Sequence, residues 1–264
     1  MLPTVEFIAA SNHPLANSAH LTPDRTFSTV SLNIAKTTDP NEVVNAIRVT
    51  PRLRDADLYL FQEVRNEEGR PSVAEEAARK LGHSIAFAAS APGVYDQGLA
   101  MVSRHPITNV QITRLKAYDL RFHCRNRIAM AATVQSPRGD LYAWNVHLDT
   151  RINPQERVEQ LQPVIDDAAS HTGPRLIGGD FNTNGMYWLG KVIPFPCGRT
   201  HSFAIRSAMK LHGFESPLPD GLNTFPPFRR HLDWIFLNEL QVFETGVVPA
   251  PFSDHNAILV RVGL

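Results

Sequence analysis

A strand-like segment that ends in two glycines and a carboxylate is the feature that most constrains the fold of this chain. The apolar run 174–179 stops at Gly178-Gly179-Asp180-Phe181-Asn182. Glycine allows tight backbone geometry that a side chain would block, and the chain then presents a carboxylate and a carboxamide two residues apart. Such an ending favours a chemical site at the edge of a sheet, although a plain strand-to-turn junction has a similar composition.

Strand-like runs recur along the chain, and several carry a polar residue at one end. The predicted strands are 27–33, 57–62, 84–88, 98–103, 127–135, 140–147, 174–179, 232–237 and 256–262. The polar residues at or beside their ends are, in chain order, Asn33, Glu63, His147, Asp180, Asn182, Asp233, Asp254 and His255. The repetition of this pattern indicates a shared site, which a single junction would not.

Helical patterns separate these runs. Helices are expected to begin at Asp39-Pro40, at Pro71, at Asn153-Pro154 and at Thr200. Gly82 and Gly213 are expected to close the second and the fourth. Pro163 lies inside the third helix and is expected to kink it or to end its first half.

The mixture of paired strands and helices predicts an α/β protein with two mixed sheets packed face to face and helices outside. We expect one domain over residues 27–264, preceded by a loose or extended lead-in over residues 1–26. Two stretches, 186–199 and 217–230, are rich in proline and aromatic residues and are predicted to be irregular. Such loops either shape a substrate site or merely cover the ends of the sheets.

The bulk composition bounds the function. The 264 residues include 26 Lys plus Arg and 26 Asp plus Glu, so the formal net charge is zero. The whole chain therefore has no global attraction for a polyanion, which counts against a non-specific nuclease unless a local basic patch is present.

The cysteines and the apolar runs give further expectations. Cys124 and Cys197 lack zinc-site spacing and are expected to be reduced thiols. No signal peptide and no apolar run of about 18 residues are evident, so a cytoplasmic protein without a membrane span is expected. A monomer is the default expectation.

The ordered fragments resemble the endonuclease/exonuclease/phosphatase family, the DNase I-like metal-dependent phosphoesterases. The resemblance runs from about residue 28 to residue 264. It rests on the Leu-Asn, Gln-Glu-Val, Gly-Asp-Phe-Asn, Leu-Asp-Trp-Ile-Phe and Ser-Asp-His fragments, and on the strand and turn over 98–106. It implies a four-layer α/β/β/α sandwich.

The resemblance also implies roles at a metal centre. Phosphoester hydrolysis needs a cation on the phosphoryl oxygens, an activated water and donors where charge grows. Hard oxygen ligands suit Mg²⁺ or Mn²⁺. The implied ligands are Glu63, with Asn33 and Asp254 as further contributors. Asp180 would orient or deprotonate the attacking water and Asn182 would hold the phosphate or the nucleophile, unless both bind a second metal.

Two histidines complete the implied site. His255 would pair with Asp233 and act either as a cation beside the phosphoryl group or as a base. His147 would face the scissile phosphate and could protonate the leaving oxygen. Asp149 could orient His147 or cap the following loop, and Arg127 could contact the substrate or form a surface ion pair.

The sequence therefore predicts a divalent-metal-dependent phosphoester hydrolase that uses direct attack by water, since no nucleophile motif is present. A small or lipid-linked phosphoester is the favoured substrate. A first alternative is an endo- or exonuclease acting on DNA or RNA through basic loops over 121–127 and at Arg229-Arg230. A second alternative is a catalytically inactive binding module.

Overall fold

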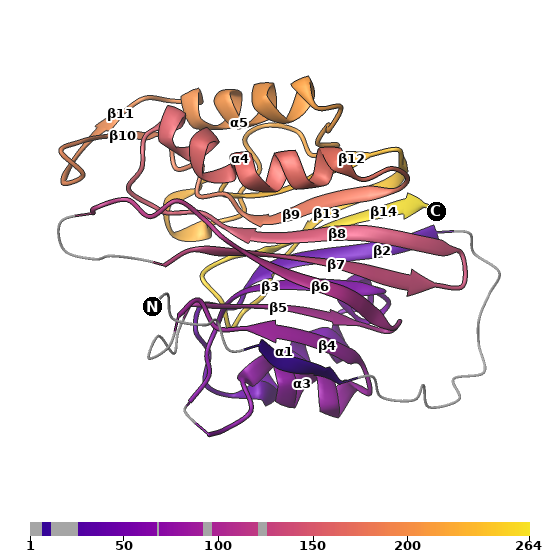
Figure 1. Cartoon of the computed structure of the whole chain (residues 1–264). Helices are drawn as coiled ribbons and strands as arrows, with labels where there is room; N and C mark the ends of the chain where they lie inside the picture. Colours follow the sequence, from indigo (N-terminus) through magenta and orange to yellow (C-terminus); the bar gives the residue numbers. More distant parts are fainter. Residues whose placement is uncertain (1–6, 12–25, 68, 92–96, 121–125) are drawn as a thin grey trace, which may run out of the picture.

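Two β-sheets lie face to face between two layers of helices in the computed structural model of this chain (Figure 1). The structure describes residues 7–11, 26–67, 69–91, 97–120 and 126–264. Helices α1 and α3 cover the outer face of one sheet, and α4 and α5 cover the outer face of the other. The expected four-layer α/β/β/α sandwich is confirmed.

The first sheet has the strand order β1-β4-β5-β3-β2-β14-β13. Its strands are β1 (Phe7–Ser11), β2 (Thr26–Asn33), β3 (Leu58–Val64), β4 (Ser84–Ala88), β5 (Gly98–Ser103), β13 (Gln241–Val248) and β14 (Ala257–Gly263). Helices α1 (Pro40–Val49) and α3 (Val73–Leu81) pack on it, and the short α2 (Pro51–Arg54) follows α1. The apolar face of α1, with Val43, Val44 and Ile47, is buried in this layer.

The second sheet has the strand order β12-β9-β8-β7-β6. Its strands are β6 (Ile107–Arg114), β7 (Ile128–Ser136), β8 (Gly139–His147), β9 (Arg175–Asp180) and β12 (Asp233–Asn238). Helices α4 (Pro154–Ser170) and α5 (Thr200–Leu211) cover its outer face. Beside α4 and α5 lies a separate hairpin of β10 (Met186–Leu189) and β11 (Ile193–Pro196).

The two sheets enclose an apolar core that one polar bridge crosses. Gln62 on β3 donates from Nε2 to Asn145 Oδ1 on β8 at 2.7 Å. Asn145 donates in turn to the carbonyl oxygens of Phe61 and Ala100 in the first sheet. Both amides are fully buried. Buried amides keep their hydrogen bonds only in one arrangement of their partners, so this bridge fixes how the sheets face one another.

The predicted strands all occur, with ends that differ by at most two residues. The expected helix starts at Asp39-Pro40, Asn153-Pro154 and Thr200 are confirmed. Pro71 does not open α3, because Ser72 caps the helix in a reciprocal capping box with Glu75. Of the two expectations for Pro163, an end of the first half of the helix is wrong, since α4 runs through Pro163 to Ser170, and a kink stays a prediction.

Several strands were missed by the sequence patterns. β10 and β11 lie in the stretch 186–199 that was predicted to be irregular, so that prediction is wrong there. β6 and β13 are edge strands with many exposed residues, and β1 within the expected lead-in pairs with β4. Cys124 lies outside the described residues, whereas Cys197 is a free thiol. In the part of the chain described here, no helix is long and apolar enough to span a membrane.

Candidate active site

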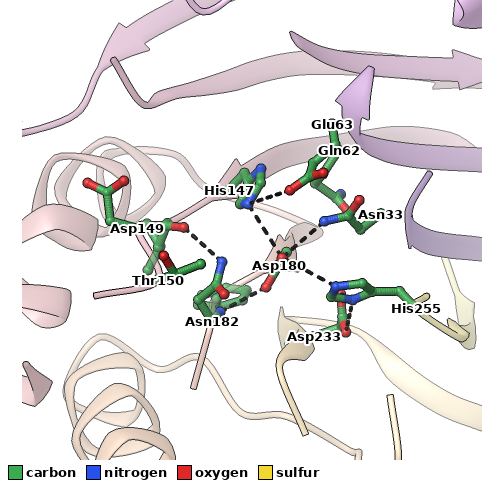
Figure 2. A network of polar contacts seen from close by, with 12 residues as sticks. Asn33, Gln62, Glu63, His147, Asp149, Thr150, Asp180, Asn182, Asp233 and His255 are labelled. Atoms are coloured by element: carbon green, nitrogen blue, oxygen red, sulfur yellow. Dashed lines mark hydrogen bonds and ion pairs between the residues drawn. The ribbon is translucent and has the colours of Figure 1, made fainter. Parts of the chain in front are cut away.

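Strand register brings the predicted residues together at one edge of the sandwich. In the second sheet β9 lies between β8 and β12, and Asp180 is paired with His147 on one side and Asp233 on the other. In the first sheet Asn33 ends β2 beside Gln62 of β3. Because the sheets face each other, these strand ends form the two sides of one site (Figure 2).

One oxygen of Asp180 is the centre of this site (Figure 2). Asn33 donates from Nδ2 to Asp180 Oδ2 at 3.2 Å. The same Oδ2 lies 3.4 Å from His147 Nε2 and 3.9 Å from His255 Nε2. His147 Nε2 is also 3.8 Å from Glu63 Oε1. Side chains from both sheets therefore converge on a single carboxylate.

Glu63 reaches the site through an irregularity in β3. The pairing of β3 with β5 shifts register between Phe61 and Val64, and Glu63 has a φ of 52°. A residue with a side chain rarely adopts this left-handed conformation, and it costs on the order of 1–3 kcal/mol. A bulge of this kind redirects a side chain. The carboxylate of Glu63 is 19% exposed, more than its buried neighbours His147 and Asp180.

The turn after β9 depends on one glycine and one asparagine. Gly179 has a φ of 147°, and a Cβ there would overlap the carbonyl of Val146 on β8. Asn182 has a φ of 53°, which asparagine tolerates better than most residues. The turn lets the backbone N–H of Asn182 donate to Asp180 Oδ1 at 2.9 Å. The Gly-Gly-Asp-Phe-Asn fragment thus shapes the backbone that orients the carboxylate.

His255 forms a buried pair with Asp233. Its Nδ1 lies 2.9 and 3.1 Å from the two Asp233 oxygens, so Nε2 is the atom turned toward Asp180. Burial opposes protonation of His255, but the charge of Asp233 and its hydrogen bond outweigh burial and raise the pKa to about 10. Phe225 packs on the same imidazole with ring centroids 4.9 Å apart. The pairing implied by the sequence is present, and His255 is a cation at neutral pH.

Arg127 fixes the tautomer of His147. Its Nη1 lies 2.9 Å from His147 Nδ1, and a guanidinium can only donate. Nδ1 is therefore the acceptor, and the proton of the neutral ring is on Nε2, which faces Asp180 and Glu63. Arg127 Nε donates to Asp149 Oδ1 at 3.0 Å. Asp149 thus orients His147 indirectly, and Arg127 is a buried residue of the site rather than part of a surface ion pair.

Two predicted residues have surroundings that differ from their implied roles. The Asn182 amide donates from Nδ2 to the carbonyl of Leu148 at 2.9 Å, so this side chain holds the loop after β8. Asp254 is exposed and makes no hydrogen bond or ion pair within the described residues, although its charge helps to raise the pKa of His255. The metal roles of Asp254 and Asn182 stay predictions.

A buried arginine that the sequence patterns missed supports both loops of the site. Arg157 on α4 donates from Nη1 to the carbonyls of Asp149 and Phe181, at 2.6 and 2.7 Å. Its Nε donates to His201 Nδ1 at 2.9 Å. The sequence did contain a sign of this role, because Arg157 stands four residues before Leu161 and therefore on the same, inward face of α4. A cation on that face indicates buried carbonyl partners.

The charges and donor atoms of the site are suited to a divalent metal ion. Burial raises the pKa of Asp180 to about 7, and the charge of Asp233 adds to the effect. Asp180, Asp233 and His255 lie together, with one polar atom of each within 4.8 Å of the others, and the carboxylate oxygens are the possible ligands because His255 is protonated. Glu63 adds another carboxylate beside them. Oxygen donors that repel one another in a buried site are the donor set that Mg²⁺ and Mn²⁺ favour.

The comparisons with known proteins agree with this geometry. The family model described as the Endonuclease/Exonuclease/phosphatase family matches residues 30–255. A UPF0294 protein of Yersinia pseudotuberculosis is 31% identical over 103 residues, which are 39% of this chain and 35% of that protein. The chain therefore matches about a third of the length of this curated relative.

Solved structures show the same fold. An endonuclease/exonuclease/phosphatase family protein from Leptotrichia buccalis superposes with a TM-score of 0.67 at 17% identity, covering 90% of this chain and 100% of that one. An endonuclease/exonuclease/phosphatase from Beutenbergia cavernae gives a TM-score of 0.64 at 18% identity, covering 91% and 72%. With a family match over most of its length, the chain belongs to the endonuclease/exonuclease/phosphatase family.

Proposed function

We propose that this protein hydrolyses a phosphate ester by direct attack of water, with a divalent metal ion. The observation that carries the proposal is the convergence of Asn33, His147 and His255 on one oxygen of Asp180, with Glu63 beside them. This arrangement offers a proton acceptor, hydrogen-bond donors and metal ligands within one buried site. Nothing in it resembles an activated serine or cysteine nucleophile.

Glu63 and Asn33 are the proposed ligands of Mg²⁺ or Mn²⁺, with Asp254 as a further contributor. Glu63 is more exposed than Asp180, and Asn33 ends the neighbouring strand β2 beside Gln62. The metal ion, when bound, supplies positive charge at the phosphoryl oxygens. If a second ion binds, Asp180 and Asn182 are its proposed ligands.

Asp180 is the proposed acceptor of the proton from the attacking water. The Asn182 backbone N–H and the Asn33 amide hold its two oxygens in place. A general base acts best when its pKa is close to the working pH, and burial raises the pKa of Asp180 to about 7. The structure therefore supports this residue as the base better than it supports His255, which is already protonated.

The two histidines are the proposed donors on either side of Asp180. His147 presents an Nε2–H because Arg127 occupies its Nδ1. His255 presents Nε2 as part of the imidazolium that Asp233 holds. Donors fixed before the reaction stabilise charge that develops in the transition state without reorganising. We assign His147 to the leaving oxygen and His255 to the phosphoryl oxygens.

A small or lipid-linked phosphoester is the proposed substrate, and a nucleic acid is the second candidate. The nucleic-acid candidate is favoured by the segment whose Phe225 packs on His255. In this segment Phe225 and Phe228 stack with ring centroids 5.8 Å apart. Phe228 is 72% exposed, and Arg229 and Arg230 follow it. Aromatic rings next to basic side chains are the usual platform for a nucleobase and its phosphate.

Hydrolysis of a chromogenic phosphodiester and of its monoester, with Mg²⁺, Mn²⁺ or EDTA, tests the proposal. We expect metal-dependent turnover that EDTA removes and that His255→Ala reduces by at least about 100-fold. Turnover that persists in EDTA would contradict the proposed mechanism. A calorimetric titration of Mn²⁺ into the wild type and Glu63→Gln gives a second readout, in which the variant should bind the ion more weakly.

A further inference from the structure

A cavity with an unusual concentration of positive charge lies next to the candidate active site. It has a volume of about 220 Å³, and its lining includes Arg199, Arg229 and Arg230. Asp220 is the acidic residue in that lining, and Arg206 pairs with it at 2.7 Å. The three lining arginines have no ion pair or side-chain hydrogen bond with any residue that the structure describes. The cavity therefore carries uncompensated positive charge.

The backbone around the cavity adds to this charge. α5 has 12 residues and begins at Thr200, and its N-cap Arg199 provides no side-chain cap. Ser202 in the first turn of α5 lines the cavity. The N-terminus of a helix carries partial positive charge and unpaired N–H groups, which attract anions. Gly185 lets the chain approach closely at the cavity, because a Cβ there would lie 2.6 Å from the carbonyl oxygen of Gly198 and 3.2 Å from Arg230 Nη1.

The cavity adjoins the catalytic residues through the backbone. Thr183 lines it and directly follows Asn182, and its Oγ1 donates to the carbonyl of His231 at 2.5 Å. His231 also lines the cavity and stands two residues before Asp233. The loop that bears Arg229 and Arg230 also carries Phe225, whose ring packs on His255. The lining of the cavity is therefore joined to the active-site residues within one or two positions of the chain, at Thr183 and at His231.

We infer that this cavity, the arginine pocket of Arg199, Arg229 and Arg230, binds a second phosphate group of the substrate, one that is not hydrolysed. The inference rests on the proposed function, since it assigns the pocket to the substrate of that site. The positive charge, the open helix terminus and the adjacency to Asp233 all favour a phosphate ester. Substrates with two or more phosphates, whether small molecules or nucleic acids, share this chemistry.

The experiment compares two chromogenic substrates that differ by one phosphate. Thymidine 5′-(p-nitrophenyl phosphate) has only the reacting group, and its 3′-phosphorylated form has a second one. We expect the added phosphate to raise kcat/KM of the wild type about tenfold, since a charged hydrogen-bonded contact is worth this much. The double variant Arg199→Gln/Arg230→Gln should lose most of that gain. Arg79→Gln, an exposed arginine on α3 outside the pocket, should keep it.

Two further arms separate the sources of the phosphate. If kcat/KM rises again with p-nitrophenyl esters of longer oligothymidylates, the pocket holds a nucleic-acid backbone; if it does not, the substrate is small. Titration of pyrophosphate in EDTA should show binding to the wild type and Arg79→Gln, and loss of binding in the double variant. Loss of that binding without any gain from the 3′-phosphate would mean that the pocket holds a free anion, and would overturn the inference.

The outcomes distinguish this inference from the proposed function. A wild type that hydrolyses neither ester contradicts the proposed hydrolysis, and the pyrophosphate titration then decides alone whether the pocket binds phosphate. Equal pyrophosphate binding by the wild type and the double variant overturns the pocket, whatever the turnover. A circular dichroism melt of each variant shows whether it is folded.

Discussion

Asp180 serves the chemistry of the site at the expense of the fold. Its carboxylate is buried near Asp233, and this burial raises its pKa to about 7. The folded state therefore disfavours the charged form, and the resulting destabilisation is fully present above pH 7 and absent below the unfolded pKa near 4. Without a metal ion, the wild type should therefore lose stability between pH 4 and pH 7 relative to a variant with a neutral side chain of the same shape.

Asp180→Asn tests this conflict. Between pH 5 and pH 8 in EDTA, we expect the free energy of unfolding of the variant to rise relative to that of the wild type by on the order of 1–3 kcal/mol, because only the wild type must ionise the buried carboxyl group. The same change should lower kcat by a factor of about 10² to 10⁴, since the proton acceptor is lost. Urea unfolding and turnover of the chromogenic ester measure the two effects. Asp140→Asn, at an exposed carboxylate on β8, should change neither. An equal pH dependence of stability in the wild type and Asp180→Asn would contradict the argument.

Arg127 is expected to act through His147. Its guanidinium donates to Nδ1, so the ring carries its proton on Nε2, where the site needs a donor. Arg127→Met removes that donor and should allow the Nδ1–H tautomer, which we expect to lower kcat about 10- to 100-fold. The ¹⁵N shifts of His147 report the tautomer directly.

Arg127→Lys separates positioning from a loss of folding. Lysine keeps a positive donor, so the Nε2–H tautomer and part of the activity should return. If the ¹⁵N shifts of His147 are the same in the wild type and Arg127→Met, then Arg127 does not set the tautomer. Loss of activity with unchanged shifts would point instead to a direct contact between Arg127 and the substrate.

At the scale of elements, the close pairing of the parallel strands β8 and β9 depends on Gly179. A Cβ at this position would overlap the carbonyl of Val146, and the φ of 147° is one that side chains avoid. Gly179→Ala should therefore lower the free energy of unfolding by at least about 3 kcal/mol. Gly246→Ala on edge strand β13 is the control, because its Cβ would meet only the flexible end of Arg52. Chemical unfolding of both variants measures the difference, and equal losses would contradict it.

The strands that the sequence predicted are those that bury one or both faces. β9 and β5 are buried along their whole length, so their apolar runs are continuous. β6 and β13 lie at sheet edges and consist almost entirely of exposed and half-buried residues, so they lack the apolar run that marks a buried strand. The site residues could be predicted because each stands at a strand end. Their mutual contacts could not, because the facing of two sheets depends on buried pairs such as Gln62 and Asn145.

At the scale of the whole molecule, the net charge of zero conceals a separation of charge. Carboxylates of Glu63, Asp180 and Asp233 gather at the active site, and the arginine pocket lies next to them. Neither cluster is visible in the composition, since the loop with Arg229 and the helix start at Arg199 are distant in sequence. A net charge of zero is therefore compatible with a local phosphate-binding surface. The sequence argument against a nuclease had made this exception for a local basic patch.

Acid should destabilise the whole protein through three histidines. Burial lowers the pKa of His83, His201 and His231 to about 4. Their ordinary unfolded pKa is about 6.5, so the unfolded chain binds these protons first. The stabilisation from keeping them neutral is full above pH 6.5 and is lost as the pH falls toward 4. His255 does not contribute in this window, because its pKa is raised and it is protonated in both states.

Asp180 has the opposite effect on stability to the three histidines between pH 6.5 and pH 4. Its pKa of about 7 means that the folded protein holds a proton that the unfolded chain releases. Unfolding between pH 6.5 and 4 should therefore take up two protons net, and the free energy of unfolding should fall by roughly 2 kcal/mol per pH unit. The variant Asp180→Asn lacks the proton that Asp180 releases on unfolding. Its free energy of unfolding should therefore fall about half as steeply again with decreasing pH. Urea unfolding in EDTA at intervals from pH 4.5 to 6.5 measures both slopes. A wild-type stability that is level across this range would mean that these histidines are protonated in the folded protein.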